Sequence, residues 1–441
     1  MLQILANRTY RHLFLAQVIA LVGTGLATVA LGLLAYQLAG ADAGTVLGTA
    51  FAIKMAAYVG VAPVATALAN RLPRRTMLVC LDLVRAAVAL LLPFVSQAWQ
   101  VYVLIFVLQA ASAAFTPTFQ ATIPDVLPDE KDYTQALSLS RLAYDLESLL
   151  SPMLAAALLT VASFHNLFAG TVVGFLASAA LVVSVVLPSP KASERRGIYD
   201  RTTRGLRIYL ATPRLRGLWA VQAGVAAAGA MVFVNTVVLV QSAWELGQTD
   251  VALALAAFGA GSMVAALALP QALERLPDRP VMLAGVTVLV LGLALGPLVN
   301  GLHGLLALWF VLGLGYSAAQ TPSGRLLRRS AHPEDRPAVY AAQFALSHAC
   351  WLVFYPLAGW LGAQAGLPWA FAVHAVAAVF ALVLALKLWP ADDPEVLEHT
   401  HHALPAGHAH AQGAQARPEG LRHAHPFVVD DLHMHWPGPE R

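Results

Sequence analysis

The chain has 441 residues, of which 58% are hydrophobic and only 12% are charged. Soluble domains carry about 25% charged residues, so this composition excludes an ordinary soluble protein and predicts one with many membrane spans. The slightly basic charge balance is explained by basic loops facing an anionic lipid leaflet, without nucleic-acid binding. The two cysteines, Cys80 and Cys350, lie in apolar stretches and predict neither a disulfide framework nor a thiolate metal site.

Twelve apolar runs are long enough to cross a bilayer, which takes about 20 residues. The first run exceeds the roughly 7–15-residue core of a secretory signal, so we expect it to be retained as a helix. The twelve runs lie near 12–38, 45–69, 76–96, 99–121, 135–161, 166–187, 216–240, 250–272, 280–299, 303–321, 338–363 and 368–388.

Positive charges predict the orientation of these spans. Arg8 and Arg11 precede the first run, and each loop after an even-numbered run up to the tenth also contains Lys or Arg, as in the polar stretch 188–215. The alternate loops contain neither residue. By the positive-inside rule, both termini and the central stretch are cytoplasmic.

The two halves of the chain repeat each other. The segment Asn70–Arg75 after the second run matches Glu274–Arg279 after the eighth, and Thr116-Pro117 matches Thr321-Pro322 at nearly the same offset. Two six-span halves in parallel repeat are the pattern of the major facilitator fold. We therefore expect an all-α membrane protein divided into an N-terminal half, a basic linker, a C-terminal half and a flexible histidine-rich cytoplasmic tail, at 1–187, 188–215, 216–388 and 389–441.

The loop after the second run carries a family resemblance. The segment from Thr66 to Arg75 resembles the facilitator signature G-x-x-x-D-R-x-G-R-R: its three arginines are present, whereas Thr66, Asn70 and Pro73 replace Gly, Asp and Gly. The Asp82-Leu-Val-Arg85-Ala segment and the fifth run look like the multidrug and siderophore exporter branch. The resemblance covers about residues 1–390 and implies that a cytoplasmic gate involves Arg71, Arg74, Arg75, Asp82 and Arg85.

The fifth run holds the densest set of intramembrane charges. An ionisable group at mid-bilayer costs at least about 2.5–3.5 kcal/mol, so it needs a partner, an aqueous cavity or a function. Arg141 and Asp145 are four residues apart and can pair on one helical face, whereas Glu147 is rotated about 200° from Asp145. We expect Asp145 or Glu147 to bind a proton, a metal ion or both in turn. The alternative is a structural Arg141–Asp145 pair with Glu147 paired elsewhere.

Other ionisable residues in the spans have two interpretations each. Lys54 lies in the middle of the second run, and its depth predicts an acidic partner, either Glu147 or Asp145. Asp82 and Arg85 share nearly the same face of the third run and form either a gate or a structural network. His348 and His374 are the histidines well inside spans; either can contact a metal, although lone histidines between helices are more often simply hydrogen-bonded.

The tail contains nine of the chain's fifteen histidines. In an extended segment, side chains at i and i+2 point the same way, so each His-x-His pair can offer two imidazoles to one ion. Neutral imidazole binds Ni, Co, Cu and Zn. The candidate metal ligands, in four pairs counting the doubled His402, are His399, His401, His402, His408, His410, His423, His425, His433 and His435.

Together with this tail, the chain resembles bacterial nickel-resistance exporters of the facilitator superfamily. The resemblance implies a proton antiporter in a bacterial inner membrane that exports Ni²⁺, or Co²⁺, from the cytoplasm. The chain has no P-loop and no metalloenzyme motif, so we expect no enzymatic activity and no cofactor. Its expected partners are a small cation, protons and the lipid bilayer, without nucleic acid, and we expect a monomer.

Three interpretations of the tail remain open. In the first, it gathers metal at the cytoplasmic mouth and feeds or regulates efflux. In the second, it binds or stores metal while the body exports an unrelated organic compound. In the third, it is an incidental extension. The regular pairing of its histidines argues against the last. A hypothesis from another class is a membrane-anchored metal sensor or buffer whose body does not transport.

Overall fold

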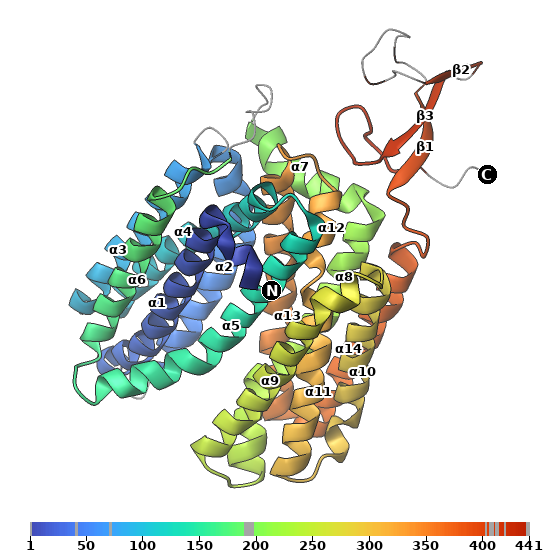
Figure 1. The fold of residues 1–441 in the computed structure, drawn as a ribbon. Helices are drawn as coiled ribbons and strands as arrows, with labels where there is room; N and C mark the ends of the chain where they lie inside the picture. Colours follow the sequence, from blue (N-terminus) through green and yellow to red (C-terminus); the bar gives the residue numbers. More distant parts are fainter. Residues whose placement is uncertain are drawn as a thin grey trace.

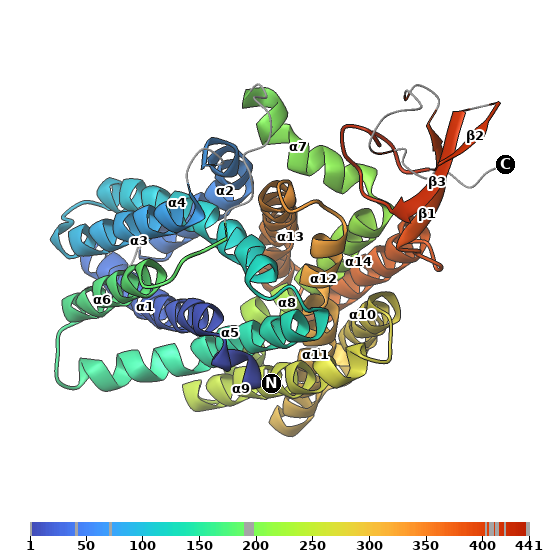
Figure 2. The ribbon, with the colours of Figure 1, turned by 45° about the horizontal axis from the view of Figure 1, so that its top comes forward.

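The computed structural model describes residues 2–39, 43–69, 73–188, 198–401, 404, 410, 414–418 and 420–437. Two bundles of long helices lie side by side, and a small sheet lies beyond the C-terminal bundle (Figures 1 and 2). The N-terminal half contains α1 (Arg8–Ala39), α2 (Ala43–Ala69), α3 (Arg74–Leu91), α4 (Ala98–Val126), α5 (Glu130–Leu159) and α6 (His165–Val183). The C-terminal half contains α8 (Pro213–Val237), α9 (Gln248–Leu273), α10 (Asp278–Leu295), α11 (Leu302–Gln320), α13 (Arg336–Gln364) and α14 (Leu367–Leu388).

Shorter elements connect and extend these helices. The amphipathic helix α7 (Ile198–Ala211) lies in the central linker, and α12 (Ser323–Arg329) precedes α13. The described residues also form short 3₁₀ segments, η1 (Leu2–Ala6), η3 (Leu92–Phe94) and η5 (Gly296–Leu298), and a short π-helical segment, η4 (Val238–Ala243). The end of the molecule that carries α7, α12 and the C-terminal sheet is called the tail side below (Figure 1); it is the side predicted to be cytoplasmic.

The twelve long helices coincide with the twelve apolar runs. Ten of the described helical segments are long and apolar enough to cross a membrane. Helix α2 also has the length, and its described portion Ala52–Ala65 is apolar. Helix α5 is long enough as well, and Arg141, Asp145 and Glu147 lie within it.

The two halves pack in the same pattern, as expected for a parallel repeat. Helix α1 contacts α6 as α8 contacts α14, α2 contacts α4 as α9 contacts α11, and α3 contacts α6 as α10 contacts α14. The halves meet where α2 packs on α13 and where α5 packs on α9. Because α2 corresponds to α9 and α5 to α13, these two contacts are equivalent in the repeat. Pro73 and Pro277 occupy equivalent caps at the starts of α3 and α10, which is where a residue without a free backbone N–H is tolerated in a helix.

Three short strands lie in the described part of the tail, which the sequence predicted to be a flexible segment. Strands β1 (Val396–His401), β2 (Gln415–Arg417) and β3 (Gly420–Pro426) form an antiparallel sheet in the order β1-β3-β2. The β1–β3 register pairs His399 with His423. Because facing residues of an antiparallel pair lie on the same side of the sheet, this register gathers histidines that lie 24 positions apart in the chain.

Candidate functional site

Lys54 lies on α2 and Glu147 on α5, and both helices contact α1. The Lys54 ammonium and the Glu147 carboxylate attract each other electrostatically, so Glu147, of the two acids considered, is the one that interacts with this lysine. The Ser151 hydroxyl and the Glu147 carboxylate both lie against Gly25 of α1: a Cβ atom built on this glycine would lie 2.7 Å from the Glu147 Oε1 atom and would overlap the Ser151 side chain. The absence of a side chain at Gly25 therefore lets the carboxylate approach the backbone of α1.

Aromatic side chains connect the surroundings of Lys54 to the C-terminal half. The Lys54 Nζ atom lies 5.6 Å from the centre of the Tyr58 ring, and that ring meets the His348 imidazole edge-on at 4.7 Å. His348 hydrogen-bonds the carbonyl of Phe344 through Nδ1 at 2.7 Å. His348 thus contacts the surroundings of Lys54, whereas His374 is buried and hydrogen-bonds the Ala370 carbonyl of its own helix.

Arg141 joins the two halves of the molecule. It forms the expected ion pair with Asp145, whose side chain is buried. The Arg141 Nε atom also donates to the Ser262 hydroxyl of α9 at 3.1 Å, and its guanidinium lies 4.8 Å from the Tyr316 ring of α11. Since α9 and α11 belong to the other half, these contacts have to change whenever the halves separate.

Asp82 and Arg85 form a network inside the N-terminal half. They pair with each other, and the Ser178 hydroxyl donates to Asp82 at 2.7 Å. The Arg85 guanidinium lies over the Phe115 and Phe175 rings, at 4.0 and 4.5 Å. All five residues lie on α3, α4 and α6, so these contacts favour the structural alternative over a gate between the halves.

The arginines of the facilitator-like loop have different surroundings. Arg74 pairs with Asp125 at the end of α4, and Arg75 donates to the Val183 carbonyl. Arg71 lies outside the described residues. Asp125 also pairs with Arg336 at the start of α13, so Arg74 connects to the other half through the carboxylate that the two arginines share.

Several such contacts fasten the halves together at the tail side. The Lys131 ammonium lies 2.9 Å from the Glu274 carboxylate, and a hydrogen bond joins the Tyr133 and Tyr340 hydroxyls. We call this set of contacts the tail-side lock; its members are the pairs Asp125–Arg336, Glu130–Arg325, Lys131–Glu274 and Tyr133–Tyr340. Asp125 and Arg336 were not among the predicted site residues. The available signal was a pair of similar loops rich in proline and acidic residues, residues 128–132 after α4 and residues 333–336 at the start of α13.

The tail histidines converge on one cluster. One ring nitrogen from each of five residues lies within 4.8 Å of all the others; the residues are His399, His410, His423, His425 and His433. The expectation was that each His-x-His pair would offer its two imidazoles to one ion. The structure instead draws members of all four pairs together, because the strand register and the segment after β3 bring distant histidines to the same place.

The remaining candidate ligands have different places. His401 lies beside the cluster, with its Nε2 atom 3.1 Å from that of His399. His435 is described and is not part of the five-residue group. His402 and His408 lie outside the described residues.

The spacing of the nitrogens suits a single metal ion. The Nε2 atom of His399 lies 3.2 Å from that of His423 and 3.0 Å from that of His433, which is 3.2 Å from that of His410. Metal–imidazole bonds of about 2.0–2.1 Å place neighbouring ligand nitrogens about 2.9 Å apart in an octahedron and about 3.4 Å apart in a tetrahedron. The buried Nε2 atom of His425 has no hydrogen-bond partner among the described residues. The donor set therefore fits a first-row divalent ion.

The protonation of the cluster also favours metal binding. Burial, together with repulsion from neighbouring imidazoles, lowers the pKa values of His399 and His410 to about 4. These rings are therefore neutral near pH 7, the form that binds metals. The Asp430 carboxylate bonds the Nδ1 atom of His433 at 2.8 Å, which leaves the Nε2 atom of that ring facing the cluster, an orientation typical of metal-binding histidines.

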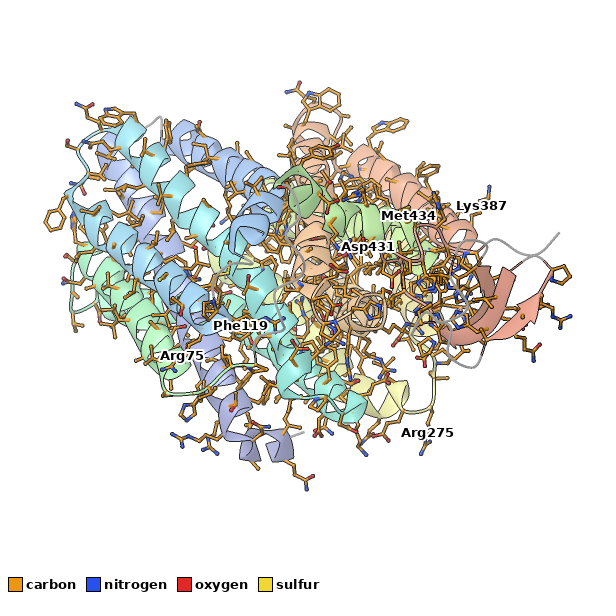
Figure 3. All side chains as sticks on the ribbon, turned by 90° about the horizontal axis from the view of Figure 1, so that it is seen from above. Arg75, Phe119, Arg275, Lys387, Asp431 and Met434 are labelled. Carbon is orange, nitrogen blue, oxygen red and sulfur yellow. The ribbon has the colours of Figure 1, made fainter. Side chains whose placement is uncertain are left out.

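The cluster is attached to the C-terminal half and to α7. Asp430 hydrogen-bonds His332 at 3.3 Å, and these bonds from His332 and His433 hold the pKa of Asp430 well below its ordinary value despite burial. Asp431 pairs with Arg204 of α7 at 2.8 Å. Phe427 belongs to the hydrophobic core of the C-terminal half. Figure 3 places Asp431 over that half, away from Arg75 and Phe119.

Comparisons with known proteins agree with this architecture. The sequence profile of the Major Facilitator Superfamily matches residues 13–243 and 218–421. The uncharacterized MFS-type transporter YfiS of Bacillus subtilis (strain 168) is 29% identical over 120 residues, which are 27% of this chain and 28% of that protein. The matched segment thus spans less than a third of the relative.

Two solved structures share the fold. The human organic anion transporter MFSD10 (TETRAN) superposes with a TM-score of 0.76 at 13% sequence identity. A bacterial homologue of the iron transporter ferroportin, in an outward-facing state, superposes with a TM-score of 0.70 at 12% identity. Each comparison covers 86% of this chain and 99% of the other protein.

Proposed function

Since this chain belongs to the Major Facilitator Superfamily, we propose that it is a secondary transporter that exports a divalent transition metal from the cytoplasm in exchange for protons. The chain is a multi-pass membrane protein and not an enzyme. What we propose beyond this is the metal cargo, the outward direction of transport and its coupling to protons. We also propose that the protein lies in a bacterial inner membrane and acts as a monomer.

One observation carries the choice of a metal as cargo. Five imidazoles converge at the tail side of a transporter, with nitrogen spacings that match the ligand shell of a single ion. A body of the same fold occurs in a bacterial homologue of an iron transporter. Imidazole alone binds Cu²⁺, Ni²⁺, Zn²⁺ and Co²⁺; the resemblance to nickel-resistance exporters places Ni²⁺ first and Co²⁺ second.

The intramembrane charges support coupling to protons. Proton and metal ion compete for one carboxylate, which is the simplest physical basis for antiport. Glu147 carries such a carboxylate, and its attraction to Lys54 stabilises the charged form after the proton has left. Arg141 contacts both halves, so its pairing with Asp145 responds to their relative movement. We assign proton coupling to Glu147 first, with Lys54, Arg141 and Asp145 as the groups that respond to it.

A second candidate is a proton-coupled exporter of a drug or siderophore with a metal-binding regulatory tail. The observation that favours it is the fold shared with an organic anion transporter at a TM-score of 0.76. In this case the histidine cluster binds metal, whereas the body carries an organic compound.

The test is uptake of ⁶³Ni²⁺ into inverted membrane vesicles with and without a proton gradient. The intact protein is compared with Glu147→Gln and with the double variant His399→Ala/His433→Ala. His303→Ala, which removes an exposed histidine at the opposite end of the molecule, serves as the control. Gradient-dependent uptake that is lost in Glu147→Gln and only reduced in the double variant supports metal antiport.

Other outcomes of this test have clear meanings. If the intact protein takes up no nickel while its tail binds the ion, nickel export is wrong, and drug or siderophore substrates are tested next in the same vesicles. A protein that transports none of these and still binds metal is the membrane-anchored sensor or buffer. Uptake that does not depend on the gradient contradicts proton coupling.

A further inference from the structure

We propose that the five-histidine cluster is a regulatory site for one divalent first-row transition-metal ion, and that the bound ion stabilises the closed tail-side lock through Asp430 and His332. The inference rests on metal binding by the tail, which the proposed function also requires. It goes further, because it assigns the ion in the tail a control function instead of mere capture.

The first step is that one ion organises four separate segments. His399 lies on β1, His410 between β1 and β2, His423 and His425 on β3, and His433 beyond β3. An ion bound by these nitrogens fixes the segment after β3 relative to the sheet. That segment contains Asp430, whose Oδ1 atom bonds the His433 Nδ1 atom and also accepts from the His433 backbone N–H at 2.7 Å.

The second step is the contact between Asp430 and the loop before α13. The Oδ2 atom of Asp430 bonds the His332 imidazole, while the backbone carbonyl of His332 accepts the N–H groups of Asp335 and Arg336 at 2.9 and 3.0 Å. His332 therefore contacts the tail through its side chain and caps the first turn of α13 through its backbone carbonyl. Arg336, in that turn, is the lock residue that pairs with Asp125 of the other half.

The third step is a parallel contact through α7. Arg204 pairs with Asp335 and with Asp431, next to Asp430. Helix α7 packs against both α13 and α2, and these two helices belong to different halves. The tail is thus attached to the lock by His332 and by Arg204, and both attachments end at the start of α13.

The direction of the effect follows from these contacts. A metal ion that holds Asp430 and Asp431 in place favours the conformation of Asp335 and Arg336 in which Arg336 reaches Asp125. The ion therefore binds more tightly when the lock is closed, and linkage requires that closing the lock tightens metal binding by the same factor.

The test measures the lock directly in the full-length protein in lipid nanodiscs. Cys80 and Cys350 are first changed to alanine. Cysteines then replace the exposed residues Lys131 and Glu274, and a spin label is attached to each of the two new thiols, which leaves no free thiol. Losing this exposed ion pair costs little. Double electron–electron resonance measures the distances between the two labels, and from them the ratio of closed to open lock, without and with Zn²⁺. Zn²⁺ is diamagnetic and binds imidazole ligands.

The expected result is that Zn²⁺ raises the closed-to-open ratio about fivefold or more, the lower end of typical coupling between sites. The variant His332→Ala/Arg204→Ala retains every proposed ligand; we expect it to bind one Zn²⁺ per chain without a change in the ratio. His303→Ala is the matched control and keeps the full response. The measurement is repeated with Arg336→Ala, which opens part of the population and is expected to weaken zinc binding.

Three outcomes overturn the inference: no zinc bound by the intact tail, an unchanged ratio with zinc bound, or an equal response in His332→Ala/Arg204→Ala. An unchanged ratio in a protein that still exports nickel contradicts the regulatory site alone. A normal response of the lock in a protein that does not transport metal contradicts the proposed function alone.

Discussion

The two six-helix halves share their packing and differ in where their charges lie. In the N-terminal half, charged residues occupy the middle of α2, α3 and α5, at Lys54, Asp82, Arg85 and the group from Arg141 to Glu147. In the long helices of the C-terminal half, every charged residue lies within four residues of a helix end. The C-terminal half supplies Ser262 and Tyr316 as neutral partners for Arg141, and the surface against which the tail packs.

This difference suggests a division of labour. Charges inside a membrane are costly and are retained where they act or are paired, so the proposed ion coupling falls to the N-terminal half. The C-terminal half presents His332 to the histidine cluster and Arg336 to the lock. On these proposals, the N-terminal copy of the repeated fold couples ion movement, and the C-terminal copy holds the residues that control the lock.

The largest expected effect tests the N-terminal side of this comparison. Glu147→Gln removes the carboxylate that we assign to proton binding, and we expect gradient-driven nickel uptake in inverted vesicles to fall to background. Ser262→Ala, on the C-terminal side of the same interface, is expected to keep most of the uptake. Equal losses in both variants would contradict the assignment of coupling to the N-terminal half.

The next effect tests the tail. Asp430→Asn weakens the acceptor that orients His433, and loss of such a partner typically lowers metal affinity about 10–100-fold. Isothermal titration of the full-length protein with Ni²⁺ measures this change. His435→Ala is the control, since His435 is not part of the five-residue cluster, and an equal loss of affinity there would place the site elsewhere.

A smaller effect is expected where the halves meet. Arg141→Lys keeps the charge beside Asp145 and loses the planar group that contacts Ser262 and Tyr316. We expect the maximal rate of nickel uptake to fall roughly tenfold, about 1.4 kcal/mol of free energy, with little change in the amount of protein in the membrane. An unchanged rate would show that the contact between halves does not limit transport.

The smallest effect is expected at the exposed lock pair. Lys131 and Glu274 are about half exposed, and such ion pairs contribute roughly 0–1 kcal/mol. Lys131→Ala therefore changes uptake less than Arg336→Ala, because Arg336 pairs with the more buried Asp125. The two variants are compared by initial uptake rate, and a larger loss for Lys131→Ala would contradict this ranking.

Some features of the site could be read from the chain alone. Arg141 and Asp145 are neighbours on one helix, so their pairing follows from a separation of four residues and is present in the structure. Asp82 and Arg85 also pair locally. The acidic partner of Lys54 could only be narrowed to two residues, because Lys54 lies on α2 and both acids lie on α5; in the structure, Glu147 is the acid that interacts electrostatically with Lys54.

The sequence by itself determined the twelve long apolar helices, their division into two repeated halves and the regular pairing of histidines, the candidate metal ligands, in the tail. These features depend on hydrophobic length, residue type and short spacing, all of which are local. Only the tertiary structure decided that Asp125 meets Arg336 and that histidines from four pairs form one cluster. Contacts such as these join residues up to 211 positions apart, and they are brought together by helix packing and strand register, which no local pattern specifies.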